Sequence, residues 1–301
     1  MHGWLIIDKP IGIGSTQIVA AAKRALREGG YPKVKVGHGG TLDPLATGVL
    51  PVALGEATKL SGRMLDADKR YDFTIRFGEE TETLDAEGAI VATSEIRPTL
   101  SEAQAVLAGF TGQIDQVPPA YSALKVEGKR AYALARAGEA VELKSRRVTV
   151  HDLSILSELA PRKVGESLQE LTLSATVSKG TYIRSLARDI ARALGTVGHV
   201  TMLRRTKAGP FTLEPAISLD KLSELAKARQ LEQALLPLTA GLDDIPALSV
   251  TPDQARALRQ GRRLAGIAAK PGLHLATELS VPVALVELFE GELRVVRGFN
   301  F

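Results

Sequence analysis

The sequence contains no cysteine among its 301 residues. This absence excludes disulfides, a thiol nucleophile, and zinc or iron–sulfur centres held by thiolates. The five histidines are scattered and form no HExxH or similar pair, so no metal site is predicted. The chain has no Walker A sequence and no GxSxG elbow, and Gln17 stands where a dinucleotide fingerprint beginning at Gly12 needs a glycine. Nucleotide-cofactor and serine-hydrolase functions are therefore discarded, and no cofactor is expected.

Long apolar runs are also missing, because the longest candidates have the length of a strand. No membrane-spanning segment is predicted. The first residues, Met1 to Leu5, carry no basic stretch of the kind that begins a secretory signal. With the lack of cysteine, these features predict a protein of a reducing, cytoplasmic compartment with no membrane partner. A chain of this length suffices for one large domain and a small one.

Positive charge is concentrated in three segments, although the formal net charge is only +4. Residues 121–150 carry seven Lys/Arg against three Glu, and residues 179–207 carry seven against Asp189 alone. Residues 252–270 carry five against Asp253. Any one cluster is equally compatible with a solvated helix face. Three clusters on an otherwise balanced chain favour a polyanionic partner, and therefore nucleic acid.

Local patterns predict both strands and helices. Apolar or alternating runs predict strands over residues 4–8, 71–77, 171–177, 283–286 and 293–296. Capping residues and helical periodicity predict helices that begin at Ser15 or Thr16, at Thr99, at Thr181 and at Thr251. The short strands after residue 245, separated by Gly and Pro, predict a small C-terminal barrel.

The densest Gly/Pro/Thr stretch runs from Gly37 to Pro51 and holds one carboxylate, Asp43, directly before Pro44. Loops of this kind hold functional groups on a rigid scaffold, and proline biases the preceding residue away from helix. An aspartate that makes a local side-chain turn is nevertheless the commoner outcome for Asp-Pro. Composition alone therefore leaves the role of Asp43 open.

The same stretch, GHGGTLDPLATGVLP, resembles the catalytic motif of the standalone tRNA pseudouridine-55 synthases, the TruB family. Further segments resemble that family at residues 5–10, 68–71, 178–185 and 203–205. The likeness is specific from residue 4 to about 210 and looser beyond, where the family has a PUA domain. By this resemblance Asp43 is the catalytic carboxylate, Tyr71 stacks on the target base, and Arg184 pairs with Asp43.

The resemblance also implies substrate contacts for a further set of residues, namely Lys9, His38, Asp85, Tyr182 and Leu203. His38 would occupy space vacated by flipped nucleotides, and Asp85 would belong to an active-site network. Residues 118–147 would be an inserted basic segment that closes on RNA. Its predicted RNA contacts are Lys125, Lys129 and Arg130.

Each assignment has a structural alternative. Without the resemblance, a solvated side chain is the commoner case for a lone helical arginine such as Arg184, and Tyr71 is compatible with a cross-strand packing aromatic. Tyr182 could be a core residue, His38 could satisfy loop carbonyls, and Asp85 could make a turn.

The chain also departs from the family pattern after Lys9-Pro10-Ile11-Gly12. The family usually has a Thr/Ser-Ser pair and then a His/Asn-Asp pair, whereas this chain has Ser15-Thr16-Gln17. The helix start still has a capping residue, so the fold is not in doubt. The departure puts in question any polar role that the family's aspartate has at this position.

The resemblance implies an α+β fold with a mixed, largely antiparallel sheet, flanking helices and a small C-terminal β-barrel of the PUA type. The expected domains are a catalytic domain over residues 1–240 and an RNA-binding domain over residues 246–301. The expected reaction is the cofactor-free isomerisation of uridine 55 in the T loop of tRNA, by a monomer with no obligatory protein partner. Asp43 would act as nucleophile or as base, and the sequence does not choose between these roles.

Two alternative functions remain on the sequence alone. One is a guide-RNA-dependent pseudouridine synthase subunit, and the other is a tRNA-binding module without catalysis. The basic insertion favours direct grip on tRNA and standalone action.

Overall fold

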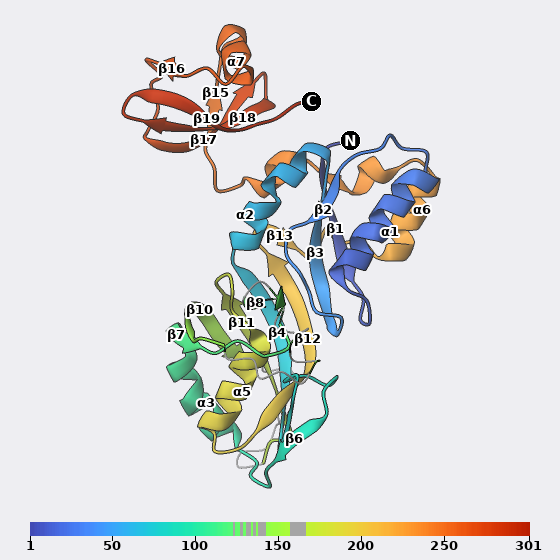
Figure 1. The fold of residues 1–301 in the computed structure, drawn as a ribbon, viewed down its shortest axis with the longest axis vertical. Helices are drawn as coiled ribbons and strands as arrows, with labels where there is room; N and C mark the ends of the chain where they lie inside the picture. Colours follow the sequence, from blue (N-terminus) through green and yellow to red (C-terminus); the bar gives the residue numbers. More distant parts are fainter. Residues whose placement is uncertain (123, 127–128, 131–133, 135–136, 138–142, 157–166) are drawn as a thin grey trace.

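The computed structural model describes residues 1–122, 124–126, 129–130, 134, 137, 143–156 and 167–301. One large mixed sheet with helices on its faces makes up most of the molecule, and a five-stranded sheet follows near the C-terminus (Figure 1). The expected α+β class is confirmed. Among the described residues, no helix is long and apolar enough to cross a membrane.

The large sheet runs in the order β14-β1-β3-β12-β4-β11-β10-β7, with β2 beside β3 and β13 beside β12. Its strands are β1 (Gly3–Lys9), β2 (Val36–His38), β3 (Ala46–Leu54), β4 (Lys69–Phe77), β7 (Gly112–Gln116), β10 (Arg146–Ile155), β11 (Glu170–Val177), β12 (Gly198–Ala208), β13 (Phe211–Thr212) and β14 (Leu235–Leu236). The described pairings are antiparallel except that of β3 with β12, which is parallel. The parallel pair joins two largely separate halves of the sheet.

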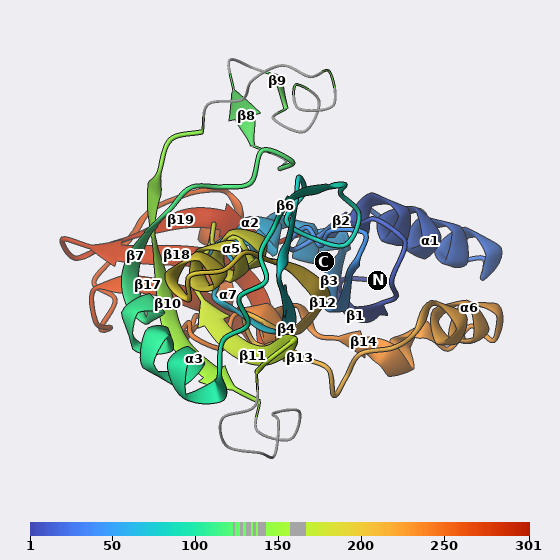
Figure 2. The same ribbon diagram turned by 90° about the horizontal axis from the view of Figure 1, so that it is seen from below.

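Helices cover both halves. On the β1–β3 half, α1 (Ser15–Glu28) packs beside α6 (Leu219–Lys227), as both views show (Figures 1 and 2). On the other half, α5 (Ile183–Ala193) packs on β4 and β12, and α3 (Leu100–Leu107) packs against α5 and β10. The remaining elements of this region are η1 (Gly55–Leu60), α2 (Ser61–Asp66), β5 (Glu79–Thr81), β6 (Ile90–Thr93), η2 (Ala108–Phe110), β8 (Lys125–Val126), β9 (Lys129–Arg130), η4 (Leu231–Ala234) and η5 (Leu238–Gly241).

Two of the predicted helix starts are confirmed and two need correction. Thr99 and Thr251 each cap a helix in a capping box. The helix predicted from Thr181 begins at Ile183, with Tyr182 as its N-cap. For α1 the N-cap is Gly14, whose N–H donates to Gln17 Oε1 at 2.7 Å, and neither Ser15 nor Thr16 caps it. The Ser15 hydroxyl bonds to the backbone of Leu42 instead.

The core of the large sheet is divided. One buried cluster lies under α3 and α5 around Phe73 and Leu186, and another lies under α1 and α6 around Ile7 and Leu50. Tyr71 and Leu203 pack against both clusters and are only partly buried. Two apolar side chains are therefore left partly open where the two halves meet.

The C-terminal sheet has the order β15-β17-β18-β19-β16 and carries one helix. Its elements are β15 (Ala247–Ser249), α7 (Pro252–Arg259), β16 (Leu264–Ala265), β17 (Gly272–Glu278), β18 (Val281–Phe289) and β19 (Glu292–Gly298). It has a core of its own, but Leu275, Leu285 and Phe299 pack into a cluster with Trp4 and Phe211 of the large sheet's region. The predicted small C-terminal β unit is present and shares buried apolar surface with the rest of the chain.

Candidate active site

A cavity of about 720 Å³ lies between the Asp43 loop, the start of α5 and the place where the two halves of the large sheet meet, here called the seam. That volume is typical of pockets for small ligands. Its walls are formed by Thr41, Leu42, Asp43, Pro44, Ala46, Tyr71, Glu82, Thr83, Asp85, Glu87, Tyr121, Ser122, Thr181, Tyr182, Ile183, Arg184 and Leu203. The structure therefore brings together these predicted site residues: Asp43, Tyr71, Asp85, Tyr182, Arg184 and Leu203.

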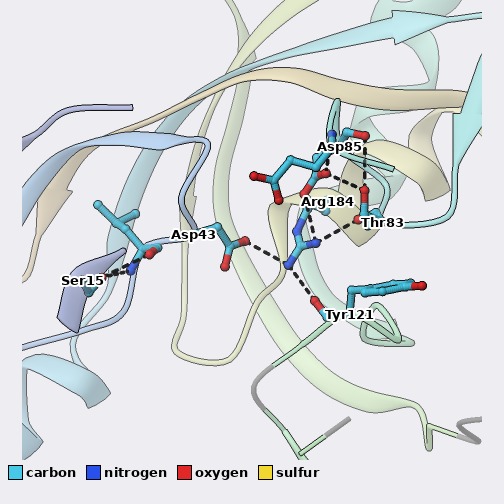
Figure 3. A network of polar contacts seen from close by, with 8 residues as sticks. Ser15, Asp43, Thr83, Asp85, Tyr121 and Arg184 are labelled. Carbon is cyan, nitrogen blue, oxygen red and sulfur yellow. Dashed lines mark hydrogen bonds and ion pairs between the residues drawn. The ribbon is translucent and has the colours of Figure 1, made fainter. Parts of the chain in front are cut away.

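Arg184 is the centre of the polar network (Figure 3). Its Nη2 lies 2.9 Å from Asp43 Oδ2 and donates to the Tyr121 carbonyl at 3.0 Å. Its Nη1 donates to the Thr83 carbonyl at 2.9 Å and to Asp85 Oδ2 at 3.1 Å. One guanidinium thus contacts two carboxylates and two carbonyls. The alternative that Arg184 is a solvated helical arginine is therefore excluded.

The two carboxylates differ in exposure. The side chain of Asp85 is 8% exposed, and its Oδ1 accepts from the Thr83 hydroxyl and from the Glu87 N–H. That of Asp43 is 43% exposed. Within the described ranges, the Asp43 side chain has no other hydrogen bond or ion pair. Asp85 is thus the buried counter-ion that holds Arg184, and Asp43 is the carboxylate that faces the cavity.

The loop that carries Asp43 is fastened on one side by Ser15. The Ser15 hydroxyl accepts from the Leu42 N–H at 2.8 Å and donates to the Leu42 carbonyl at 3.1 Å. Ser15 is buried, so these bonds are shielded from water. The predicted capping role of Ser15 is wrong because its side chain binds the residue before Asp43 instead.

On another side the loop rests on Arg205, which is almost fully buried. The guanidinium donates to the carbonyls of Gly40, Thr41 and Val49 at 3.1, 3.3 and 2.7 Å. Gly48 pairs with Arg205 across the parallel strands, and a Cβ there would lie 2.2 Å from the Arg205 carbonyl. Only glycine permits that approach, and its φ of +101° also favours glycine.

Lys9 and His38 lie behind the loop and do not line the cavity. Lys9 Nζ donates to the carbonyls of Pro10 and Pro44 at 2.9 and 3.1 Å. Burial lowers the pKa of Lys9 to about 8, although Asp43 opposes the shift. Burial, and then the charge of Arg205, lower the pKa of His38. His38 Nδ1 accepts from the Gly40 N–H at 3.3 Å, so both residues support the loop from behind.

The apolar wall of the cavity comes from the seam of the sheet. Tyr71 and Leu203 lie in the neighbouring strands β4 and β12, where Leu203 pairs with Phe73 and Tyr71 with Arg205. Tyr182 adds a second ring, and the guanidinium of Arg146 lies 4.8 Å from its centroid. These rings offer flat faces to a planar ligand.

The remaining predicted contacts are in the basic insertion. The backbones of Lys125, Lys129 and Arg130 form part of β8 and β9. Their side chains lie outside the described part of the chain, so their RNA contacts stay a prediction. No group of three or more His, Cys, Asp or Glu that could hold a metal ion occurs among the described residues.

Sequence reasoning missed the supports of the site. Thr83 and Tyr121 bind Arg184 through their backbone carbonyls, and the Ser15 hydroxyl binds the backbone of Leu42. No sequence pattern signals contacts of this kind with a distant backbone. Arg205 had a weak signal, because it lies two residues after Leu203 and strand periodicity places both on one face. Its burial beneath a distant loop was not visible in that pattern.

Known proteins share both the sequence and the fold. A tRNA pseudouridine synthase B of Novosphingobium aromaticivorans is 66% identical over 300 residues, covering 100% of this chain and 98% of the relative. One of Zymomonas mobilis is 61% identical over 301 residues, covering 100% and 97%. A solved structure of an H/ACA ribonucleoprotein bound to a substrate RNA containing 2′-deoxyuridine has a chain that is 25% identical. It superposes with a TM-score of 0.73, over 99% of this chain and 85% of its own.

The fold, the carboxylate cavity and these likenesses define a pseudouridine synthase. The N-terminal domain of the TruB family pseudouridylate synthases matches residues 25–183, and the C-terminal domain of tRNA pseudouridylate synthase B matches residues 184–243. The chain belongs to the TruB family.

Proposed function

We propose that this protein isomerises uridine 55 in the T loop of tRNA to pseudouridine, with Asp43 as the catalytic carboxylate. Support for tRNA as substrate comes from the relatives, which are named as tRNA pseudouridine synthases over their full length. The observation that carries the catalytic assignment is the half-exposed Asp43 held by the buried Arg184 in a cavity with Tyr71 on its wall.

The reaction rearranges one nucleotide without adding or removing atoms. The C1′–N1 bond breaks, the uracil turns, a C1′–C5 bond forms, and C5 loses a proton while N1 ends protonated. It is redox-neutral and needs no co-reactant. An ionised aspartate is suited either to attack the sugar carbon or to take a proton, and both roles need the Arg184 partner that orients it.

A uridine within a folded loop must leave its stack to reach Asp43. Extrusion costs a few kcal/mol, which stacking and hydrogen bonds in the pocket must offset. In this proposal the Tyr71 ring stacks on the extruded uracil, which is supported by its position in the cavity wall together with Tyr182 and Leu203. The cavity volume accommodates one nucleotide.

RNA beyond the target nucleotide needs other contacts. Residues 118–147 supply a segment that is basic in sequence, and two of its described residues, Tyr121 and Ser122, line the cavity. Residues 246–301, with five Lys/Arg in the segment 252–270, form the second RNA-binding unit of the proposal, and residues 1–240 form the catalytic unit.

A pseudouridine assay on a bare T-arm stem-loop tests the function. The purified chain should convert the single target uridine with no guide RNA and no added protein, and EDTA should leave the reaction intact apart from effects on RNA folding. Conversion only with a guide RNA and partner proteins would identify a ribonucleoprotein subunit instead. Tight binding without conversion would identify a binding module.

A further inference from the structure

A buried glutamine outside the cavity holds the residue at which α5 begins. Gln116 is the last residue of β7 and has no exposed surface. Its Nε2 donates to the Tyr182 carbonyl at 3.1 Å, and its Oε1 accepts from the Tyr182 N–H at 2.8 Å. Because one amide binds both backbone groups of one residue, the contact fixes orientation as well as distance.

This contact replaces the usual cap of the helix. Tyr182 is the N-cap of α5, and its own side chain makes no capping bond. In a capping box the N-cap N–H is bound by the side chain at position N3, which here is Ser185. The Ser185 hydroxyl instead donates to the Val117 carbonyl at 2.8 Å. The first turn of α5 is thus held by Gln116 at the end of β7, which binds the N-cap N–H, and by Val117, the next residue, which accepts from Ser185.

The first turn of α5 carries two residues that line the cavity. Tyr182 lines the wall, and Arg184 follows at position N2 with its Nη2 2.9 Å from Asp43 Oδ2. The α5 backbone therefore determines where the guanidinium stands. A misplacement of about 1 Å in such a site can cost about 10²-fold in rate.

We propose that Gln116 is a positioning residue for the isomerisation. It sets Tyr182 in the wall of the cavity and, through the first turn of α5, sets Arg184 against Asp43. This inference rests on the proposed function, because it concerns the same reaction.

Substitution by an apolar residue of similar size tests the inference. Gln116→Met removes both bonds to Tyr182, whereas Gln113→Met, at an exposed position of the same strand, is the matched control. The single-turnover rate at saturating enzyme should fall by about 10–100-fold in Gln116→Met. The Kd for the T-arm stem-loop should stay within about threefold, because phosphate contacts elsewhere supply most of the affinity. Gln113→Met should match the wild type in both.

A second variant tests whether Gln116 acts through its two hydrogen bonds to Tyr182 or only by filling space. In Gln116→Glu, a protonated carboxyl has one donor and one acceptor and can make both contacts with Tyr182. The ionised form has no donor and faces the Tyr182 carbonyl with a negative charge. The rate relative to wild type should therefore rise as pH falls from about 8 to about 5, since burial raises the pKa of a carboxyl. The corresponding ratio for Gln116→Met should not depend on pH.

A Gln116→Met rate within about threefold of wild type, or a pH-independent ratio for Gln116→Glu, would overturn the inference. If Gln116→Met does not fold, the pH profile of Gln116→Glu decides alone. If the wild-type chain forms no pseudouridine, the proposed function fails and this inference fails with it. The wild-type rate therefore distinguishes the two failures.

Discussion

Arg184 and Asp43 form an ion pair in which only the arginine is buried: their side chains are 7% and 43% exposed, and Nη2 lies 2.9 Å from Oδ2. The guanidinium is fixed by Asp85 and by two carbonyls, so it does not depend on Asp43 for its place. Asp43, in contrast, has Arg184 as its one ion-pair partner within the described ranges. The arginine is the fixed member of the pair, and the aspartate is the member exposed to the cavity.

Asp43→Asn should abolish pseudouridine formation. Asparagine keeps the shape and much of the hydrogen bonding but is a poor nucleophile and a poor base. The expected loss is on the order of 10⁴-fold or more in single-turnover rate, roughly 5 kcal/mol of transition-state stabilisation. Affinity for tRNA, measured by filter binding, should stay nearly unchanged. A rate close to wild type would overturn the assignment of the catalytic residue.

Arg184→Lys should be strongly impaired although it keeps the positive charge. A single ammonium cannot reach all the acceptors that the two terminal nitrogens of Arg184 now contact, and the planar fork toward the two carboxylates disappears. We expect a rate lower by about 10²–10³-fold with little change in Kd. Arg192→Lys is the matched control on the same helix, because the Arg192 side chain is 55% exposed. Equal rates for the two variants would contradict the role of Arg184.

Arg205→Met should destabilise the fold and loosen the catalytic loop. Three carbonyls would lose their donor in a buried place, at about 1–3 kcal/mol each before relaxation. The substitution also removes the desolvation cost of the buried charge, which offsets part of the lost hydrogen bonding. A net loss of about 2–4 kcal/mol in the free energy of unfolding is therefore expected. Arg204→Met, at a partly exposed ion pair with Asp8, should lose about 1 kcal/mol or less. Urea unfolding of both variants provides the measurement.

Lys69 should make stability depend on pH in the alkaline range. Burial, and then Arg205, lower the pKa of Lys69 from 10.5 to about 8 in the folded protein. Between those values the unfolded chain binds the proton and the folded chain does not, so stability rises with pH there. The free energy of unfolding of wild type relative to Lys69→Met should therefore increase from about pH 8 to about pH 10.5. A difference that stays flat or falls would show that Lys69 is not shifted downward.

Charge removal in the basic insertion should reduce the salt dependence of tRNA binding. Neutralising Lys125, Lys129 and Arg130 together should lower the log–log slope by about 0.7–0.9 for each phosphate that the protein no longer neutralises. Neutralising three exposed cations of α1, namely Lys23, Arg24 and Arg27, serves as the control of equal charge. Identical slopes for the two triple variants would favour solvated side chains over RNA contacts.

The sequence was informative where short-range chemistry decides the structure. The capping boxes at Thr99 and Thr251 formed as predicted, because the reciprocal bonds lie within one turn. The family resemblance, in three separate segments, led to Asp43, Tyr71 and Arg184, and the structure brings all three to one cavity. Their chemical roles remain a prediction.

Long-range contacts other than the Asp43–Arg184 pair, which the family resemblance implied, could not be predicted. Ser15 is next to the helix start, so a capping role was the local expectation, yet its hydroxyl binds Leu42 across the loop. Gln116 is an ordinary strand residue in the sequence and acquires a function only because β7 ends beside Tyr182. Such roles depend on which segments the topology brings together, and a single sequence carries no signal of that.

The parallel pairing of β3 with β12 affects the order in which the sheet can form during synthesis. β1 and β3 are near each other in the chain and can pair early, whereas β3 must wait for a strand that ends at Ala208. During synthesis the carboxylate of Asp43 thus emerges long before the guanidinium groups of Arg184 and Arg205 that orient it and support its loop. The cavity is therefore not complete until β12, which supplies Leu203 to its wall, has left the ribosome.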